Sequence, residues 1–234
     1  MELRTRQHGG TESRGGATAY DGPVTSTPVI IGGLSIPLTK PADPDRMLDD
    51  PEVLAWNQAD DYMPYWAYLW PGAFLLAEAV AAEDWKPGTA ALEIGCGLGL
   101  AGLAGLRRGL RVTFSDYDGG TFGFVEESAR ANGFGPEDYS LRRLDWREPP
   151  EERFPVILGA DVLYERRLVP LVVNVLTAML ETGGLALIAG PYRIASEEFP
   201  TLAAKAGLSC ENVPISAETT LLGGVRGTLH RVTR

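Results

Sequence analysis

From about residue 71 to the C-terminus, short apolar runs alternate with longer segments in which apolar residues recur at helical spacing. Short apolar runs are typical of buried strands, whereas a period of about 3.6 residues is typical of helices. The predicted strands are residues 89–94, 111–116, 139–146, 154–163 and 185–191, followed by closing strands at 209–218 and 226–234. The predicted helices are residues 71–82, 99–109, 120–133, 166–184 and 196–207. This alternation is that of an α/β domain.

Strands that alternate with helices imply right-handed crossovers and therefore a mostly parallel sheet. The last two predicted strands have no helix between them, which predicts an antiparallel pair at one edge. We therefore expect residues 61–234 to form one doubly wound, Rossmann-like α/β domain around a seven-stranded, mostly parallel sheet.

The chain ahead of this domain has a different character. Residues 1–22 are rich in Gly, Ser, Thr and charge, which predicts disorder. Two short β-like runs then flank a Gly-Gly pair, as in a hairpin, and Asp50 precedes a proline at the start of a short helix. We expect residues 23–60 to form a hairpin and a helix that extend the main domain.

Composition narrows the classes of function. The formal net charge of −10 argues against a binder of the nucleic-acid backbone, which normally has a basic surface. No apolar run approaches the roughly 20 residues that span a bilayer, and no signal peptide is visible, so no membrane partner is expected. Cys96 and Cys210 lie far apart and only two histidines are present, which argues against a metal site or a Ser-His-Asp triad. The expected location is the cytoplasm.

A glycine-rich turn, EIGCGLG from Glu93 to Gly99, follows the first strand of the predicted domain. In a parallel sheet of this kind, the ligand lies at the carboxyl ends of the strands. Gly95, Gly97 and Gly99 allow the chain to reverse tightly, and they allow backbone N–H groups to approach a ligand without a Cβ in the way. The turn is therefore the expected cofactor site.

The same glycines fit two kinds of ligand. Gly97, Gly99 and Gly102 also spell GxGxxG, the dinucleotide fingerprint, and Asp116 follows at roughly the distance of a ribose-binding acid. However, the turn begins before these glycines, so Gly102 is expected inside the following helix, where close packing explains a small residue. Glu93 would repel a pyrophosphate but suits a cationic amino-acid group. These details favour such a ligand over a dinucleotide, although the glycine pattern still allows a nicotinamide-dependent oxidoreductase.

The pattern from Glu93 to Gly99 resembles the class I, seven-β-strand S-adenosylmethionine-dependent methyltransferases, and the resemblance extends over almost all of the predicted domain. In that family the glycine turn carries the methionine part of the cofactor, which leaves as S-adenosylhomocysteine. The resemblance implies that Asp116, at the end of the second strand, holds the ribose hydroxyls. It also implies that Asp145 and Trp146, at the third strand end, receive the adenine.

Two further segments resemble the protein-lysine methyltransferase branch called family 16, which includes relatives of the electron-transfer-flavoprotein lysine methyltransferase and bacterial predicted nicotinamide N-methylase-like proteins. The segments are PYWAYLWPG at residues 64–72 and GADVLYE at residues 159–165. Asp161 and Tyr164 match the Asp-x-x-Tyr pattern of this branch after the fourth strand. The Asn/Asp-Pro-Pro-Tyr motif of many amide, adenine and glutamine N-methylating enzymes is absent.

This resemblance implies transfer of a methyl group to a lysine side chain, so that a protein with an accessible lysine is the expected partner. We expect Asp161 to hydrogen-bond and orient the approaching amine, and Tyr164 to belong to an aromatic wall that suits cations. Trp66 and Ala160 are expected to line the cofactor site, and no metal is required. The same residues would also suit a small-molecule amine or pyridine acceptor, or a non-catalytic module that only binds the cofactor.

Overall fold

The structure is a computed structural model that describes residues 20–234. The prediction of disorder for residues 1–22 therefore falls almost wholly outside the described residues. Within the described range, no helix is both long and apolar enough to cross a membrane.

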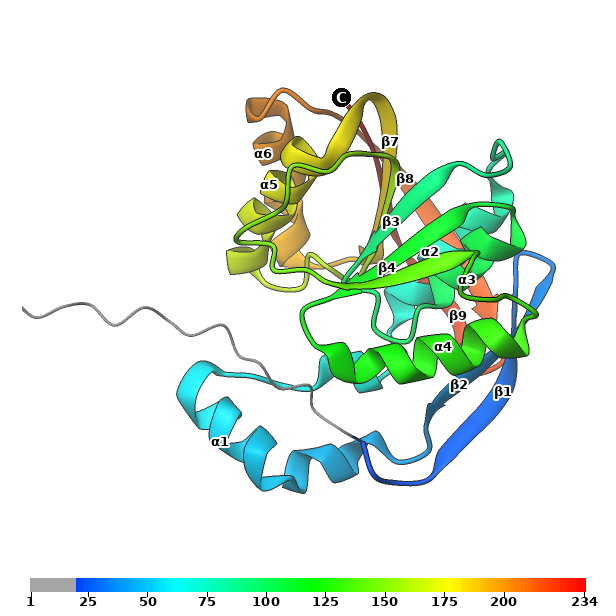
Figure 1. The fold of residues 1–234 in the computed structure, drawn as a ribbon. Helices are drawn as coiled ribbons and strands as arrows, with labels where there is room; N and C mark the ends of the chain where they lie inside the picture. Colours follow the sequence, from blue (N-terminus) through cyan, green and yellow to red (C-terminus); the bar gives the residue numbers. More distant parts are fainter. Residues whose placement is uncertain (1–19) are drawn as a thin grey trace, which may run out of the picture.

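A seven-stranded sheet with the order β5-β4-β3-β6-β7-β9-β8 forms the centre of the fold (Figure 1). Strands β3 to β7 are parallel, whereas β9 runs antiparallel to both of its neighbours. The strands are β3 (Ala90–Ile94), β4 (Arg111–Asp116), β5 (Tyr139–Arg143), β6 (Phe154–Ala160), β7 (Leu180–Pro191), β8 (Ser209–Thr219) and β9 (Gly223–Thr233). The predicted sheet and its antiparallel edge pair are thus confirmed. The strand order reverses between β3 and β6, where sheets of this kind bind ligands.

Helices cover both faces of the sheet (Figure 1). One face carries α2 (Pro71–Ala82), α3 (Leu100–Arg107) and α4 (Phe122–Ala131), and the other carries α5 (Val169–Met179) and α6 (Phe199–Lys205). The central strands are buried on both faces, and their side chains alternate between the two helical layers. In β3, Ala91 packs with α2 and α3, whereas Leu92 and Ile94 pack with α5. This is the doubly wound arrangement that the sequence predicts.

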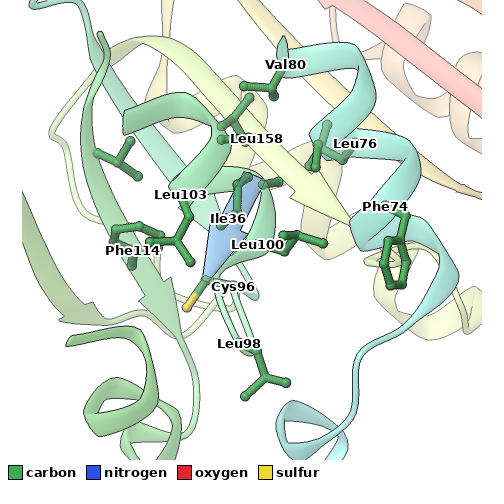
Figure 2. Packing of buried hydrophobic residues seen from close by; sticks show 14 of the residues in the cluster. Ile36, Phe74, Leu76, Val80, Cys96, Leu98, Leu100, Leu103, Phe114 and Leu158 are labelled. Carbon is green, nitrogen blue, oxygen red and sulfur yellow. The ribbon is translucent and has the colours of Figure 1, made fainter. Parts of the chain in front are cut away.

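The N-terminal hairpin packs on the helices and also touches the edge strand β8 of the sheet. Its strands are β1 (Val24–Ile31) and β2 (Leu34–Pro41), which pair antiparallel. Ile36 is fully buried among apolar side chains of α2 and α3 (Figure 2). The backbone N–H of Thr39 donates to the hydroxyl of Ser128 in α4 at 2.9 Å. The hairpin therefore adds a third layer over α2, α3 and α4.

Three short elements connect the hairpin to α2. They are the 3-10 turn η1 (Pro44–Asp49), helix α1 (Pro51–Asp60) and the 3-10 turn η2 (Tyr65–Ala67). Asp50 caps α1, because its carboxylate accepts a hydrogen bond from the N–H of Glu52 at 2.7 Å. Helix α1 projects from the body of the fold (Figure 1).

Two helix predictions need correction. The helix expected over residues 166–184 ends at Met179, because the chain becomes extended at Leu180 and joins β7, where Leu180 pairs with Phe154 of β6. The double glycine that was expected to stop the helix therefore lies within a strand. The helix expected over residues 196–207 begins only at Phe199, after a 3-10 turn over Ile194–Glu198, and Pro200 occupies the first turn of α6, where the missing N–H costs nothing.

Candidate active site

A cleft of about 580 Å³ opens at the carboxyl ends of β3, β4 and β6. Its walls are the loops that follow these strands and β5, together with the segment from residue 61 to residue 73. The volume falls in the range of roughly 300–1,000 Å³ that is usual for sites binding small molecules. All but one of the residues predicted for the site line this cleft, and Glu93 is the exception.

The glycine turn between β3 and α3 has a backbone that favours glycine. Gly95, Gly97 and Gly99 have φ angles of +58°, +48° and +75°, in the left-handed region. A Cβ at Gly95 would lie 3.0 Å from the ring of Trp146. The N–H of Gly97 donates to Oδ2 of Asp116 at 2.9 Å, which ties the turn to the end of β4. The turn is therefore tied to the end of β4, and the missing Cβ of Gly95 leaves room for Trp146.

Glu93 lies beneath the turn. Its side chain is 2% exposed, and its Oε2 accepts the N–H of Gly102 at 3.0 Å. Burial raises the pKa of Glu93 to about 8, so the carboxyl is protonated at neutral pH. A Cβ on Gly102 would lie 2.3 Å from Phe114, so packing explains this glycine inside α3, as predicted. Because the Glu93 side chain does not line the cleft, it would influence a bound cofactor only through the backbone of the glycine turn.

Asp116 ends β4 and lines the cleft. Besides the bond to Gly97, its Oδ1 accepts the N–H of Asp118 at 3.1 Å. Burial raises the pKa of Asp116 to about 6, although these backbone bonds oppose the shift. Asp118 in turn accepts the hydroxyl of Tyr62, which follows α1. The end of β4 therefore holds both the glycine turn and the segment that closes the cleft from the N-terminal side.

Asp145 and Trp146 follow β5 and form the neighbouring wall. The carboxylate of Asp145 binds the guanidinium of Arg147, with Nε 2.8 Å from Oδ1, and this ion pair lowers the pKa of Asp145. The same guanidinium lies 5.6 Å from the ring centroid of Tyr117. Trp146 is half-buried against Gly95. An acid and an aromatic wall thus stand together where the sequence predicts the adenine.

Asp161 follows Ala160, the last residue of β6, and both line the cleft. Asp161 has a φ of +53°, which is uncommon for a residue with a side chain. Its side chain is 8% exposed, and burial raises its pKa. Oδ2 accepts the N–H of Gly72 at 2.5 Å, and Oδ1 accepts a guanidinium N–H of Arg193 at 3.1 Å. One buried carboxylate therefore joins the start of α2, the end of β6 and the loop after β7.

Gly72 and Arg193 were not predicted as site residues. A Cβ on Gly72 would lie 2.4 Å from Oδ2 of Asp161, so only glycine leaves room for the carboxylate. The signal in the sequence is a glycine in the first turn of a helix, directly after a proline, where helix propensity disfavours it. Arg193 carries no comparable signal, because its contact with Asp161 depends on the fold.

Aromatic side chains form the outer wall of the cleft. Trp66 is 5% exposed and packs on Phe124, with ring centroids 5.7 Å apart. Tyr164 stands edge-on to Tyr65, with centroids 5.6 Å apart, and burial raises the pKa of Tyr164 to about 12. Trp66 therefore belongs to the core, whereas Trp70 is 38% exposed. Tyr65, Trp70 and Tyr164 line the cleft with exposed rings.

The charged side chains of the cleft favour a cationic ligand. Six carboxylates and three arginines line it, which gives a formal charge of −3. Each arginine pairs with a carboxylate, namely Arg147 with Asp145, Arg167 with Glu165 and Arg193 with Asp161. The backbone of the glycine turn, the acid at the end of β4 and this negative lining fit S-adenosylmethionine, whose sulfonium and amino group are cationic.

Comparisons with known proteins agree with this geometry. The family model described as lysine methyltransferase matches residues 54–200, more than half of the chain. No curated protein matches the sequence significantly. The fold is similar to ribosomal protein L11 methylase from Lactobacillus delbrueckii subsp. bulgaricus (TM-score 0.55, 16% identity, 70% of this chain and 78% of that chain). It is also similar to magnesium protoporphyrin IX methyltransferase from Synechocystis PCC 6803 with bound S-adenosylmethionine (TM-score 0.55, 14% identity, 68% and 76%).

At these identities the two solved structures establish the fold alone. By their names, one acts on a ribosomal protein and the other on a porphyrin, so the fold leaves the methyl acceptor open. The family model, in contrast, spans the glycine turn and the ends of β4, β5 and β6, which build the cleft. The chain therefore belongs to the lysine methyltransferase family, and it is a class I methyltransferase that uses S-adenosylmethionine.

Proposed function

We propose that the chain transfers the methyl group of S-adenosylmethionine to the side-chain amine of a lysine in a protein. The observation that carries the proposal is the position of Asp161, a carboxylate with an exposed fraction of 8% that lines the cleft near Tyr164. The bound cofactor supplies an electrophilic methyl group on a cationic sulfur. The description of the family as lysine methyltransferases supports this choice of acceptor.

Several residues are proposed to hold the cofactor. We expect the backbone of Gly95, Gly97 and Gly99 to receive the methionine part, because no Cβ obstructs the approach. Asp116 would accept the ribose hydroxyls, since a carboxylate has acceptor capacity beyond its two backbone bonds. Asp145 would accept the exocyclic amine of the adenine. These roles are assigned because all of these residues line the same cleft.

Trp146, Ala160 and Trp66 would complete the walls around the cofactor. Trp146 and Ala160 are half-buried at the ends of β5 and β6, and Trp66 is almost fully buried. A site that excludes water strengthens every charge interaction inside it. These three side chains would therefore act by shape and by desolvation.

A lysine amine must lose its proton before it attacks, although its ordinary pKa is about 10.4. Asp161 would hydrogen-bond this amine and orient its lone pair, using acceptor capacity that Gly72 and Arg193 leave free. The guanidinium of Arg193 beside it would disfavour a second cation and so favour the neutral amine. Tyr164 would supply an aromatic wall to which cationic forms are attracted. The chain's contribution is then mainly orientation and proximity.

A small-molecule amine is the second candidate acceptor, because the carboxylates and aromatic rings that line the cleft would also suit it. The family model favours the protein acceptor. The nicotinamide-dependent oxidoreductase considered from the glycine pattern is removed by the family assignment.

The test pairs turnover with cofactor affinity in Asp161→Ala. We expect methylation of lysate proteins to fall by roughly a hundredfold or more, as for the loss of a group that handles a proton or orients a reactant. The dissociation constant of S-adenosylmethionine should remain close to that of the wild type. Glu165→Ala is the matched control, since it also removes a carboxylate of the cleft that pairs with an arginine. If Asp161→Ala retains the turnover of Glu165→Ala and of the wild type, Asp161 has no part in the reaction.

A further inference from the structure

Four aromatic side chains form a continuous row along the wall of the cleft, from Tyr164, which follows Asp161 and marks the inner end, to Tyr68, which meets η1 at the outer end. Successive ring centroids are 5.6 Å apart from Tyr164 to Tyr65, 5.8 Å from Tyr65 to Trp70 and 5.8 Å from Trp70 to Tyr68. All four rings line the cleft, and we call them the aromatic row. Tyr164, Tyr65 and Trp70 are 36%, 39% and 38% exposed. Tyr68 is half-buried against the core. The row therefore offers three exposed rings and the free part of a fourth.

The row is held in place by hydrogen bonds. The indole N–H of Trp70 donates to the carbonyl of Tyr65 at 2.9 Å, and the hydroxyl of Tyr68 donates to Asp45 at 2.7 Å. Trp70 also precedes Pro71, the first residue of α2, so its backbone is fixed by the helix. A preorganised surface loses little conformational entropy when it binds a partner. Exposed aromatic groups that lie together in this way mark interaction surfaces.

The outer end of the row carries negative charge. It meets η1, where Asp43, Asp45 and Asp49 are exposed and Arg46 is the opposing cation. The inner end opens on a cleft whose lining has a formal charge of −3. A surface that is aromatic along its length and anionic at both ends complements a chain with two cationic side chains, because aromatic faces attract cations and pack on their apolar stems.

We propose that the aromatic row docks a segment of the protein substrate that carries a second basic residue beside the acceptor lysine. This inference rests on the proposed function, since it places the acceptor amine at Asp161. The second residue, an arginine or a lysine, lies over Trp70 and Tyr68 and reaches Asp45. Three successive ring contacts form a continuous surface between the two cationic positions. A polypeptide can span this surface with two basic side chains, so the occupant is a polypeptide.

The length of the row sets the spacing of the two basic residues. An extended chain advances by about 3.3 Å per residue, so the three centroid separations correspond to roughly five residues at most. We therefore expect the second basic residue between about two and five positions from the acceptor lysine.

The test measures the binding of fluorescent synthetic peptides to the full chain in the presence of S-adenosylhomocysteine. Each peptide has one lysine in a Gly/Ser/Ala background, with arginine, alanine or glutamate two to six positions away on either side. We expect an arginine at the favoured spacing to tighten binding on the order of tenfold over alanine, the size of one cation–π contact with partial desolvation. Glutamate should weaken binding relative to alanine.

Two pairs of variants locate the effect. Trp70→Ala should abolish the preference for arginine, whereas Tyr192→Ala, which removes an exposed ring outside the row, should keep it. Asp45→Lys should reverse the preference in favour of glutamate, whereas Asp84→Lys makes the same change of charge beyond the far end of α2 and should not. The reversal is a readout that a merely structural role of Asp45 would not produce.

The outcomes separate this inference from the proposed function. Equal binding of all peptides, no binding of any peptide, or an arginine preference that survives both Trp70→Ala and Asp45→Lys would overturn the docking surface. If the preference is present and depends on the row, but none of the bound peptides is methylated at lysine when S-adenosylmethionine replaces S-adenosylhomocysteine, the docking surface stands and the lysine assignment fails.

Discussion

Replacement of Glu93 by glutamine tests the electrostatics beneath the glycine turn. Glu93 is 2% exposed, and burial, opposed in part by the hydrogen bond from Gly102, raises its pKa from 4.5 to about 8. The folded protein therefore holds this carboxyl protonated at pH 7, whereas the unfolded chain ionises it. Glutamine has nearly the same shape and no charge, and its amide oxygen can accept the same N–H.

The expected gain follows from the difference in proton binding between the two states. An acid whose folded-state pKa is raised binds its proton more tightly when folded, so its contribution to stability is lost as pH rises from 4.5 towards 8. Each pH unit in this window costs the wild type about 1.4 kcal/mol of unfolding free energy. Glu93→Gln should therefore stabilise the fold by about 2 kcal/mol at pH 6 and by about 4 kcal/mol at pH 8.

The assay is urea unfolding of both proteins at pH 6, 7 and 8, with the free energy of unfolding extrapolated to water. Glu126→Gln, on the exposed side of α4, is the matched control and should not reproduce a gain that grows with pH. A difference that is independent of pH, or a destabilisation by Glu93→Gln, would refute the reasoning.

The same variant tests where Glu93 acts. Because its side chain does not line the cleft, calorimetric titration should give nearly the same affinity for S-adenosylmethionine in Glu93→Gln and in the wild type. A large loss of affinity would mean that the carboxylate itself contacts the cofactor.

Three further predictions concern packing, cofactor recognition and acid stability. Gly102→Ala should cost about 1–3 kcal/mol in urea unfolding because the new Cβ would lie 2.3 Å from Phe114; Gly123→Ala, in α4 with no atom within 4 Å of the new Cβ, should gain up to about 1 kcal/mol. Asp145→Ala should weaken S-adenosylmethionine binding in calorimetry by about tenfold, the value of one hydrogen bond to a charged group; an unchanged affinity would remove Asp145 from the adenine site. Burial lowers the pKa of His230 from 6.5 to about 4. Between these pH values the imidazole is protonated in the unfolded chain and neutral in the folded chain. Between pH 7.5 and 5.5 the wild type should therefore lose about 1 kcal/mol more stability than His230→Gln, and equal losses would contradict the shift.

The sequence is sufficient to predict the sheet and most of its helices, because each central strand is an apolar run bounded by turn residues. It also predicts which acids meet. The carboxyl ends of parallel strands converge, so Asp116, Asp145 and Asp161 had to line one cleft once the strands were assigned. The end of α5 could not be predicted, because the extended backbone at Leu180 depends on its pairing with Phe154.

The partners of the site residues could not be predicted, since they come from distant segments. Gly72 and Arg193 lie 89 and 32 positions from Asp161 in the chain, and both bond to its carboxylate. The side of the sheet to which the Glu93 side chain points could have been predicted from the sequence. In a strand, alternate residues share a face, and Glu93 shares the face of Ala91, which packs towards α2 and α3. The side chain therefore points to the start of α3, under the turn.

The most direct measurement of the central claim is mass spectrometry of a host lysate incubated with the full chain and S-adenosylmethionine carrying a trideuterated methyl group. We predict that the label appears on a lysine side chain of one or a few proteins, and that it is absent when the chain carries Asp161→Ala. Label confined to the small-molecule fraction, with none on lysine, would contradict the proposed acceptor.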